Sequence, residues 1–276
     1  MEDYLGRDAS PFSEEFWKGL DEAVVETARE ILTARRFLPL HGPLGPGIQV
    51  APTDSPVREE RTENGFTFSP KRSFVEVPQL SEDFWLLWRD LESAKREGQP
   101  FDLSAARVAA QAFCRREDQM IFYGVQVPNL GVDGLLTTPG ISKLKRGDWS
   151  TGEDAFTDIV SGISALQQKG RMGRHSLVVS PDLFVQLHRI QPGTGLMEIE
   201  RIRQLLDGRV FQATALQSGT ALLLCAQPQY VDLLVGQDIR TAYVEQAELN
   251  HHFRILETAL LRVKYPDAVI AYQSEK

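Results

Sequence analysis

The segment from residue 41 to residue 78 most restricts what this chain can fold into. It opens with the run His41-Gly-Pro-Leu-Gly-Pro-Gly47 and carries further prolines, so no helix can continue through it. Two short strand-like runs, Gly65–Phe68 and Phe74–Val77, flank the turn signal Ser69-Pro70-Lys71. We therefore predict a long, two-stranded β arm over this segment.

Such an arm needs another surface to rest on. An isolated two-stranded ribbon is marginal in water, and a loop this long without a core is usually functional or leans on something else. A disordered surface loop is the alternative interpretation. Four apolar side chains that are costly to leave in water argue against disorder, namely Phe66, Phe68, Phe74 and Val77. Because a neighbouring subunit could bury them, the arm favours a chain that assembles with copies of itself.

The composition excludes several other classes of protein. The 276 residues, 42% of them hydrophobic and 25% charged, suffice for one large folded domain or two smaller ones. A formal net charge of -8 argues against a nucleic-acid binder. The chain has only two cysteines, no apolar run near the roughly 20 residues that span a bilayer, and no apolar stretch typical of a secretory signal at its start. We expect a cytoplasmic protein that binds neither membrane nor nucleic acid.

Hydrophobic periodicity outlines the rest of the chain. It predicts an amphipathic helix over residues 12–37, a helix over residues 81–97, and a long helix from Asp102 to about Phe122 that Gly124 closes. A compact α/β lobe follows from about residue 131, and a mostly β section follows over residues 238–272. The elements expected between them are helix 154–168, strand 176–179, helices 182–190 and 196–206, and strands 209–214, 220–226 and 230–235.

Two positions on the long helix bear on possible chemistry. Glu117 and Asp118 could form a paired-carboxylate site, but we expect a solvated or interface face. Cys114 stands beside Arg115 and Arg116, which could lower the pKa of its thiol and make it reactive. We expect a buried, structural cysteine instead.

The histidines give no clear metal or catalytic motif. No zinc-binding His-Glu-x-x-His pattern, nucleophile elbow, phosphate-binding loop or dinucleotide fingerprint is found. His251 and His252 could serve a metal-dependent hydrolase, but no cysteine or second histidine pair lies near them in sequence. We therefore expect a chain without catalytic residues, without metal ligands and without a cofactor.

Four short stretches, in order along the chain, carry a family resemblance. The first is Ser10-Pro-Phe12 with Trp17 and Asp21, and the second is Ala34-Arg-Arg-Phe37 followed by Gly42-Pro43. The remaining two stretches are Glu117–Gly124 and the run Val235-Gly-Gln-Asp238 with Tyr243. Each stretch is modest alone, but in their shared order, which covers essentially the whole chain, they resemble encapsulin shell proteins.

The resemblance implies an α+β, HK97-like phage-capsid fold. Residues 1–40 would be an N-terminal helix that faces the lumen of an icosahedral shell of identical subunits, and residues 41–78 would be the extended E-loop that pairs with neighbours. The peripheral domain would comprise residues 79–130 and 225–276, and the axial domain residues 131–224. The glycine- and proline-rich hinge over residues 42–47 would let the arm take more than one angle.

The resemblance also implies a cargo site and a pore. The N-terminal helix and the final β section would hold a short targeting peptide of a cargo enzyme. The residues expected to bind that peptide are Ala28, Leu32 and Arg35 on one side and Asp238, Ile239 and Tyr243 on the other. The pore loop would be formed by Arg189, Ile190, Gln191, Pro192, Gly193, Thr194 and Gly195.

The kind of cargo is suggested by likeness to one branch of the family. The stretches Gly42–Gly45, Gln186–Ile190, Glu198–Leu205 and Leu260–Ala268 resemble the iron-storing encapsulins. This likeness implies ferritin-like cargo, with a peroxidase as the other expected type. The alternative interpretations are a major capsid protein of a tailed phage, which shares the fold, and the metal-dependent hydrolase already named.

Overall fold

Two five-stranded sheets organise the chain, which this computed structural model describes over residues 3–53, 59–69, 73–128, 130–150, 153–190 and 195–273. The first sheet has the order β1-β13-β15-β14, with β6 also paired to β15. Its strands are β1 (Leu40–His41), β6 (Gln79–Leu86), β13 (Val231–Val235), β14 (Arg240–Ala247) and β15 (Asn250–Val263). The second sheet has the order β11-β10-β12-β16-β9, formed by β9 (Ser142–Lys145), β10 (His175–Val179), β11 (Val210–Gln212), β12 (Ala221–Cys225) and β16 (Val269–Gln273).

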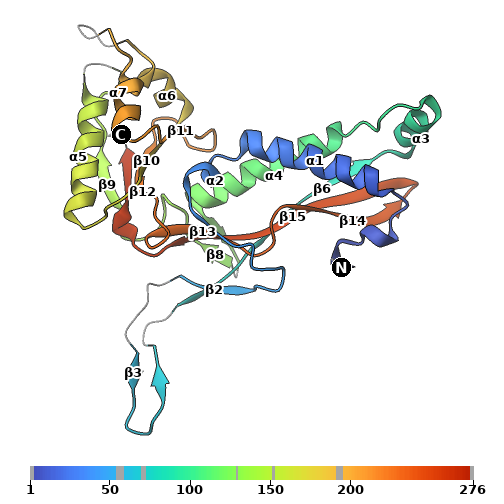
Figure 1. Ribbon diagram of the computed structural model, residues 1–276, viewed down its shortest axis with the longest axis horizontal. Helices are drawn as coiled ribbons and strands as arrows, with labels where there is room; N and C mark the ends of the chain where they lie inside the picture. Colours follow the sequence, from blue (N-terminus) through green and yellow to red (C-terminus); the bar gives the residue numbers. More distant parts are fainter. Residues whose placement is uncertain are drawn as a thin grey trace.

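Helices cover both sheets. The long helices α1 (Glu14–Ile31) and α4 (Ser104–Tyr123) lie together across the first sheet, where α4 packs on β6 and β15 (Figure 1). The second sheet forms a separate lobe with helices α5 (Asp154–Gln168), α6 (Pro181–Leu187) and α7 (Glu198–Leu205) (Figure 1). The shorter elements are η1 (Asp3–Leu5), η2 (Arg7–Ala9), α2 (Ala34–Phe37), α3 (Trp88–Glu97), η3 (Pro266–Ala268) and the hairpin of β7 (Val125–Val127) with β8 (Leu130–Val132).

The helix predicted over residues 12–37 is interrupted. The Ser13 hydroxyl accepts a hydrogen bond from the Phe16 amide and starts α1. Leu32 then leaves the helical conformation, and α2 begins only at Ala34. The reason is tertiary: the Thr33 and Ala34 amides each donate to the Asp118 carboxylate at 3.0 Å. A carboxylate from another helix therefore replaces the carbonyl partners of a continuous helix.

The prediction of a helix over residues 81–97 is wrong for the first part of this range and right for the second. Its first part is strand β6, which pairs antiparallel with β15, and only α3 is helical. Leu80, Phe84 and Leu86 point into the core with the period of two that a strand requires. Trp85 lies between two of these core residues and Leu87 follows the last one, and both are exposed. Because these two residues are also apolar, the sequence shows no alternation of apolar and polar side chains here.

The long helix and the lobe follow the prediction. The Asp102 carboxylate accepts hydrogen bonds from the Ser104 amide and hydroxyl at 2.8 and 2.5 Å just before α4 begins. Gly124 ends α4 with a φ of 76°, and a Cβ there would lie 2.1 Å from the Val132 carbonyl oxygen. Every helix and strand predicted between residues 154 and 235 is present, although several are shorter than expected.

The predicted β arm is present, but its strands pair differently. β5 (Phe74–Glu76) pairs with β2 (Val50–Pro52) at the base, and β4 (Thr67–Phe68) pairs with β3 (Glu60–Arg61) at the tip. The tip turn is closed by the Thr62 amide, which donates to the Phe66 carbonyl at 2.8 Å, with Gly65 at a φ of 84°. The predicted pairing of residues 65–68 with residues 74–77 is therefore wrong. Pro70 and Lys71 of the predicted turn lie outside the described residues.

The expected hinge at residues 42–47 is bound to the first sheet at its start. The Leu44 amide donates to the Val235 carbonyl at 3.0 Å, and the Gly45 amide donates to the Gly236 carbonyl at 2.9 Å. A Cβ at Gly42 would lie 2.1 Å from the Val235 oxygen, so the close approach requires glycine. These glycines fix the root of the arm instead of freeing it. The arm extends away from both sheets beyond this root (Figure 1).

Candidate functional site

Arg35 stands at the centre of an acidic cluster where α2, α4 and the first sheet meet. Its Nε donates to Glu117 Oε1 at 2.6 Å, and its Nη1 donates to Asp238 Oδ1 at 2.8 Å. Its Nη2 donates to Glu257 Oε2 on β15. The Glu117 and Glu257 side chains are fully buried, whereas the Asp238 side chain is 55% exposed. Arg35 therefore links the buried interior to the surface.

Glu117 and Asp118 do not form the expected solvated face. Both side chains are buried, Glu117 against Arg35 and Asp118 against the α1–α2 junction. Burial raises the pKa of Asp118 to about 6, although the amides of Thr33 and Ala34 favour its ionised form. The prediction failed because the partners come from segments far away in sequence. A charged pair on a helix gives no sign of them.

The six residues expected to bind cargo occupy three different environments. Ala28 and Leu32 are buried in the protein's own core at 6% and 5% exposure, so neither offers an exposed edge. Arg35 and Asp238 pair directly, and the Ile239 amide donates to Asp238 at 2.9 Å. These three residues lie together at the surface.

Tyr243 belongs to a different neighbourhood, near the start of α1. Its hydroxyl pairs with His251 Nδ1 at 3.0 Å, and its ring packs against Phe253 and Phe12. A groove of about 630 Å³ opens beside His251, between the start of α1, helix α3 and the tip of the β14–β15 hairpin. The sequence analysis missed this groove, although its lining is rich in aromatic and aliphatic residues: Phe12, Phe16, Trp88, Leu91, Phe101 and Leu249.

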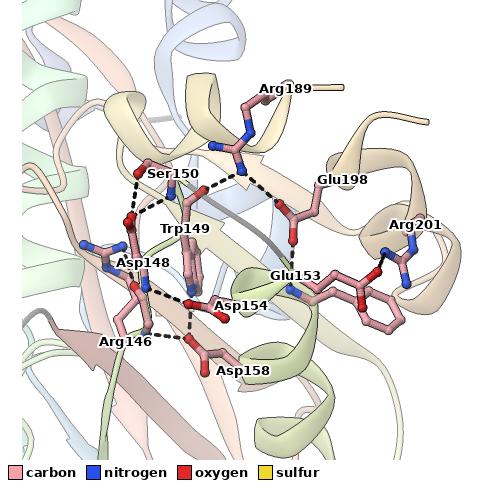
Figure 2. Close-up of polar contacts among 12 residues, drawn as sticks. Arg146, Asp148, Trp149, Ser150, Glu153, Asp154, Asp158, Arg189, Glu198 and Arg201 are labelled. Atoms are coloured by element: carbon pink, nitrogen blue, oxygen red, sulfur yellow. Dashed lines mark hydrogen bonds and ion pairs between the residues drawn. The ribbon is translucent and has the colours of Figure 1, made fainter. Parts of the chain in front are cut away.

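The loop expected to form the pore connects α6 and α7 along the chain. Residues 191–194 lie outside the described residues, but Ile190 and Met197 form a bridge at its base. Figure 2 shows Arg189 directed toward the Trp149 carbonyl at 3.5 Å and toward the buried Glu198 at 3.9 Å. Glu198 also accepts a hydrogen bond from the Phe156 amide, and burial raises its pKa. The base of the loop is thus held by α5 and the segment before it.

The remaining candidates for chemistry have structural partners. His252 stacks on Trp85 with 4.3 Å between ring centroids and lies 3.3 Å from Asp83. Within the described ranges, no group of three or more histidine, cysteine or acidic side chains could hold a metal ion. Cys114 is buried, as expected, and burial raises the pKa of its thiol to about 12. No helix in the described part of the chain is long and apolar enough to cross a membrane.

Comparison with known proteins identifies relatives along the whole chain. The family model described as "Encapsulating protein for peroxidase" matches residues 1–260. The type 1 encapsulin shell protein EncA of Myxococcus xanthus is 39% identical over 98% of this chain and 96% of its own length. A diheme-cytochrome-encapsulin shell fusion protein of Kuenenia stuttgartiensis is 35% identical over 93% of this chain and 72% of its own length. A ferritin-like-encapsulin shell fusion protein of Pyrococcus furiosus is 21% identical over 74% of this chain and 54% of its own length.

Solved structures share the fold. A virus-like particle subunit from Pyrococcus furiosus superimposes with a TM-score of 0.76 at 20% identity, covering 94% of this chain and 100% of that one. The capsid protein of Myoviridae phage XM1 gives a TM-score of 0.63 at 13% identity, covering 87% of this chain and 90% of that one. These similarities confirm the predicted HK97-like phage-capsid fold. Together with the family match, they show that the chain belongs to the encapsulin family of shell proteins, which form nanocompartments.

Proposed function

We propose that this chain closes into an icosahedral shell of about 60 or more copies in the cytoplasm. The shell encloses a cargo enzyme that carries a short targeting peptide, and the cargo is ferritin-like and stores iron, with a peroxidase as the second type. The arm acts as the E-loop, residues 1–40 form the helix that faces the lumen, and residues 131–224 form the axial domain. Residues 79–130 and 225–276 form the peripheral domain, except that β16 pairs with β12 and β9 in the sheet of the axial lobe. The names of relatives support the cargo classes, since one is a fusion to a ferritin-like protein and the family model names a peroxidase.

Three exposed phenylalanines of the arm, two at its tip and one at its base, carry this proposal. Phe66 is 73% exposed, Phe68 is 48% exposed, and Phe74 is 60% exposed. Full burial of one such side chain is worth about 1.5–3 kcal/mol. An isolated subunit leaves these side chains in water, so association with a neighbouring subunit that covers the arm would be stabilised by this amount for each buried side chain. Many weak contacts of this kind close a shell because each subunit binds several neighbours.

The paired variant Phe66→Ser with Phe68→Ser tests the proposed role of the arm. Both side chains are exposed, so we expect an unchanged circular dichroism spectrum but loss of closed particles in negative-stain images and in size-exclusion chromatography. Val108→Ser is the matched control, because Val108 on α4 is 64% exposed and lies outside the arm. Normal particles from the paired variant would contradict the proposal.

Cargo docking is proposed at the surface around Arg35, Asp238 and Ile239, with Tyr243 and the neighbouring groove continuing it along β14. Partial burial acts to raise the pKa of Asp238, but the hydrogen bond and charge of Arg35, with smaller effects of the Ile239 amide and Arg240, together outweigh it and lower the pKa. Asp238 is also half exposed, so a basic residue of a peptide can reach it. Ala28 and Leu32 support this surface from beneath. Leu32→Asp would bury a charge and destabilise the subunit, so it is no clean test of docking.

Asp238→Asn is the cleaner test of cargo docking. Shells purified from the native cell are expected to contain a ferritin-like protein or a peroxidase by mass spectrometry, with bound iron in the ferritin-like case. In the variant we expect intact shells with several-fold less cargo, because the charge that attracts the peptide is gone. Glu245→Gln, an exposed acid on β14, is the control and should load normally. Wild-type loading of Asp238→Asn would exclude this docking surface.

The two alternative functions lose support. The phage capsid proteins are similar in fold alone, at 13% identity for phage XM1, whereas the encapsulin relatives match in sequence as well. For a metal-dependent hydrolase, His251 and His252 would need to converge with other ligands. Instead, His251 pairs with Tyr243, and His252 stacks on Trp85.

A further inference from the structure

Two fully buried carboxyl groups face each other across one guanidinium in the core of the first sheet. Glu117 comes from α4 and Glu257 from β15, and each uses one oxygen to accept a hydrogen bond from Arg35. The other two oxygens, Glu117 Oε2 and Glu257 Oε1, receive no N–H donor from the described residues. The same guanidinium therefore holds both carboxyl groups in one buried site, where their other oxygens have no hydrogen-bond donor among the described residues. Two buried carboxyl groups held this close to one cation favour a state in which one of them carries a proton.

The surrounding charges also require that proton. Among the described residues, Arg35 from α2 is the cation in direct contact with both carboxyl groups, whereas Asp118 from α4 and Asp238 from the loop before β14 add negative charge. The other titratable groups near the cluster are the buried thiol of Cys114 on α4 and Arg240, which lies closer to Asp238. Burial and the charge of Glu117 raise the pKa of Glu257 well above its usual range, against the opposing effect of Arg35. Two ionised carboxylates beside one arginine would leave a buried charge unbalanced.

We propose that Glu117 and Glu257 share a single proton at neutral pH and, with Arg35, form a proton-dependent clasp that fastens the α1–α2 segment to α4 and β15. The clasp is closed while the proton is held. Removing the proton at alkaline pH sets two buried carboxylates against each other and loosens the segment. The clasp is a property of the folded subunit, so it stands whether or not the cargo proposal holds.

The direction of the pH effect follows from linkage. In the unfolded chain Glu257 loses its proton at an ordinary pKa, whereas in the folded subunit it keeps the proton to a higher pH. The clasp's contribution to stability is therefore complete in acid and is lost as pH rises through the folded pKa. Other groups whose pKa values burial raises, such as Asp118, Glu198 and Cys114, lower stability in the same direction as pH rises. The part of the decline that disappears when Glu257 is replaced by glutamine is the part assigned to the clasp.

Glutamine substitutions provide a sharp test, because glutamine has the shape of a protonated glutamic acid. The single variants Glu117→Gln and Glu257→Gln each mimic the protonated pair and leave one carboxylate for Arg35. We expect both to melt within a few degrees of the wild type at neutral pH and to show a smaller decline in melting temperature with rising pH than the wild type. The double variant leaves Arg35 with Asp238 alone, and we expect it to melt about 10 °C lower at every pH.

The comparison uses assembled protein at one concentration and one heating rate, since both affect an apparent melting temperature. Glu92→Gln on the exposed face of α3 is the control and should keep the wild-type pH profile. A single variant that declines with pH as steeply as the wild type would overturn the shared proton. Additive effects of the two single substitutions would overturn it as well, because independent carboxylates predict additivity.

Infrared spectroscopy gives a second readout, which does not rest on a melting temperature. At about pH 7.5 Asp118 is ionised, so the part of a carboxylic-acid C=O band that is present in the wild type and absent from Glu257→Gln reports the protonated pair. We expect this band in the wild type, its loss in the same pH range as the decline in melting temperature, and its absence from Glu257→Gln. A wild-type spectrum without the band at that pH would show that both carboxyl groups are ionised and that no clasp proton exists.

Discussion

At the scale of single residues, burial decides the chemistry of this chain more than residue type does. Cys114 stands beside two arginines in sequence, an arrangement that can activate a thiol. In the folded subunit Arg115 and Arg116 are exposed, while the thiol faces the core. Burial raises its pKa to about 12, and the charges of Glu117 and Glu257 add to the shift. Cys225 is buried as well, with a pKa of about 11.

Both thiols are therefore expected to resist modification in the native protein. The thiolate is the reactive form, and at pH 8 a thiol with a pKa of about 12 is ionised roughly a thousandfold less than an ordinary cysteine. Ellman's reagent should label neither cysteine within minutes in native protein and both in urea. Rapid, stoichiometric labelling of the native protein would mean that one of these sites opens readily.

At the scale of elements, close approach fixes how α5 sits on the second sheet. The Tyr272 hydroxyl on β16 donates to the Asp158 carbonyl at 2.9 Å. A Cβ at Gly162 would lie 2.0 Å from that hydroxyl and 2.8 Å from Leu223. Glycine in a helix interior normally costs about 0.5–1 kcal/mol relative to alanine. At this position the missing side chain lets helix and sheet make contact.

Gly162→Ala is therefore expected to destabilise the subunit by about 2 kcal/mol, despite the better helix propensity of alanine. Gly19→Ala in α1 is the matched control, because a Cβ there meets nothing within 4 Å and should stabilise the helix. Adding Tyr272→Phe to Gly162→Ala removes the nearest clashing atom and should recover part of the loss. Denaturant unfolding of the wild type, of the single variants Gly162→Ala and Tyr272→Phe, and of the double variant measures the coupling, and strict additivity would argue against the contact.

The elements also show how far sequence reasoning reaches. Local signals were sufficient for α4 and α5, whose starts and ends carry Asp102, Gly124 and Gly170. They were insufficient wherever a distant segment decides the structure. Asp118 interrupts the first helix, and β15 draws residues 79–86 into a strand. The arm was predictable from its prolines and aromatics, but its pairing was not, because strands of two or three residues carry almost no register signal.

The same limit applies to the candidate site. Family resemblance brought Arg35 and Asp238 together correctly, since they pair at 2.8 Å. It did not reveal that Ala28 and Leu32 are buried, because an amphipathic stripe does not tell which of its edges faces solvent. Glu257 was not singled out at all. Its role depends on β15 passing beneath α4, which no pattern along β15 indicates.

At the scale of the whole molecule, one arginine braces the passage between the two sheets. Arg171, in the loop after α5, pairs with Asp267 in η3 at 3.0 and 3.1 Å. Its guanidinium also lies 5.0 Å from the Tyr230 ring centroid and 4.2 Å from that of Tyr265. Tyr230 directly precedes β13 and Tyr265 lies just after β15, and both strands belong to the first sheet. Asp267 lies in η3, which leads into β16 of the second sheet. The brace thus ties the lobe to the rest of the subunit.

Arg171→Met should loosen that passage without unfolding either sheet. We expect faster amide hydrogen exchange in η3 and the start of β16, and unchanged exchange in β14, because only the former lose a partner. Arg174→Met in the same loop is the control, since its side chain is exposed. Equal effects of both substitutions would mean that general loop charge matters and that the brace does not.

The course of β16 has a consequence for how the protein is made. In the second sheet β12 pairs with β10 on one side and with β16 on the other. The β16 side of β12 stays unpaired in the described sheet until residues 269–273 are synthesised. Among the described strands, β9 in turn pairs only with β16. The second sheet therefore cannot be completed before residues 269–273 have been synthesised. Chains cut short before β16 are expected to lack a finished lobe, although all three of its helices precede that strand.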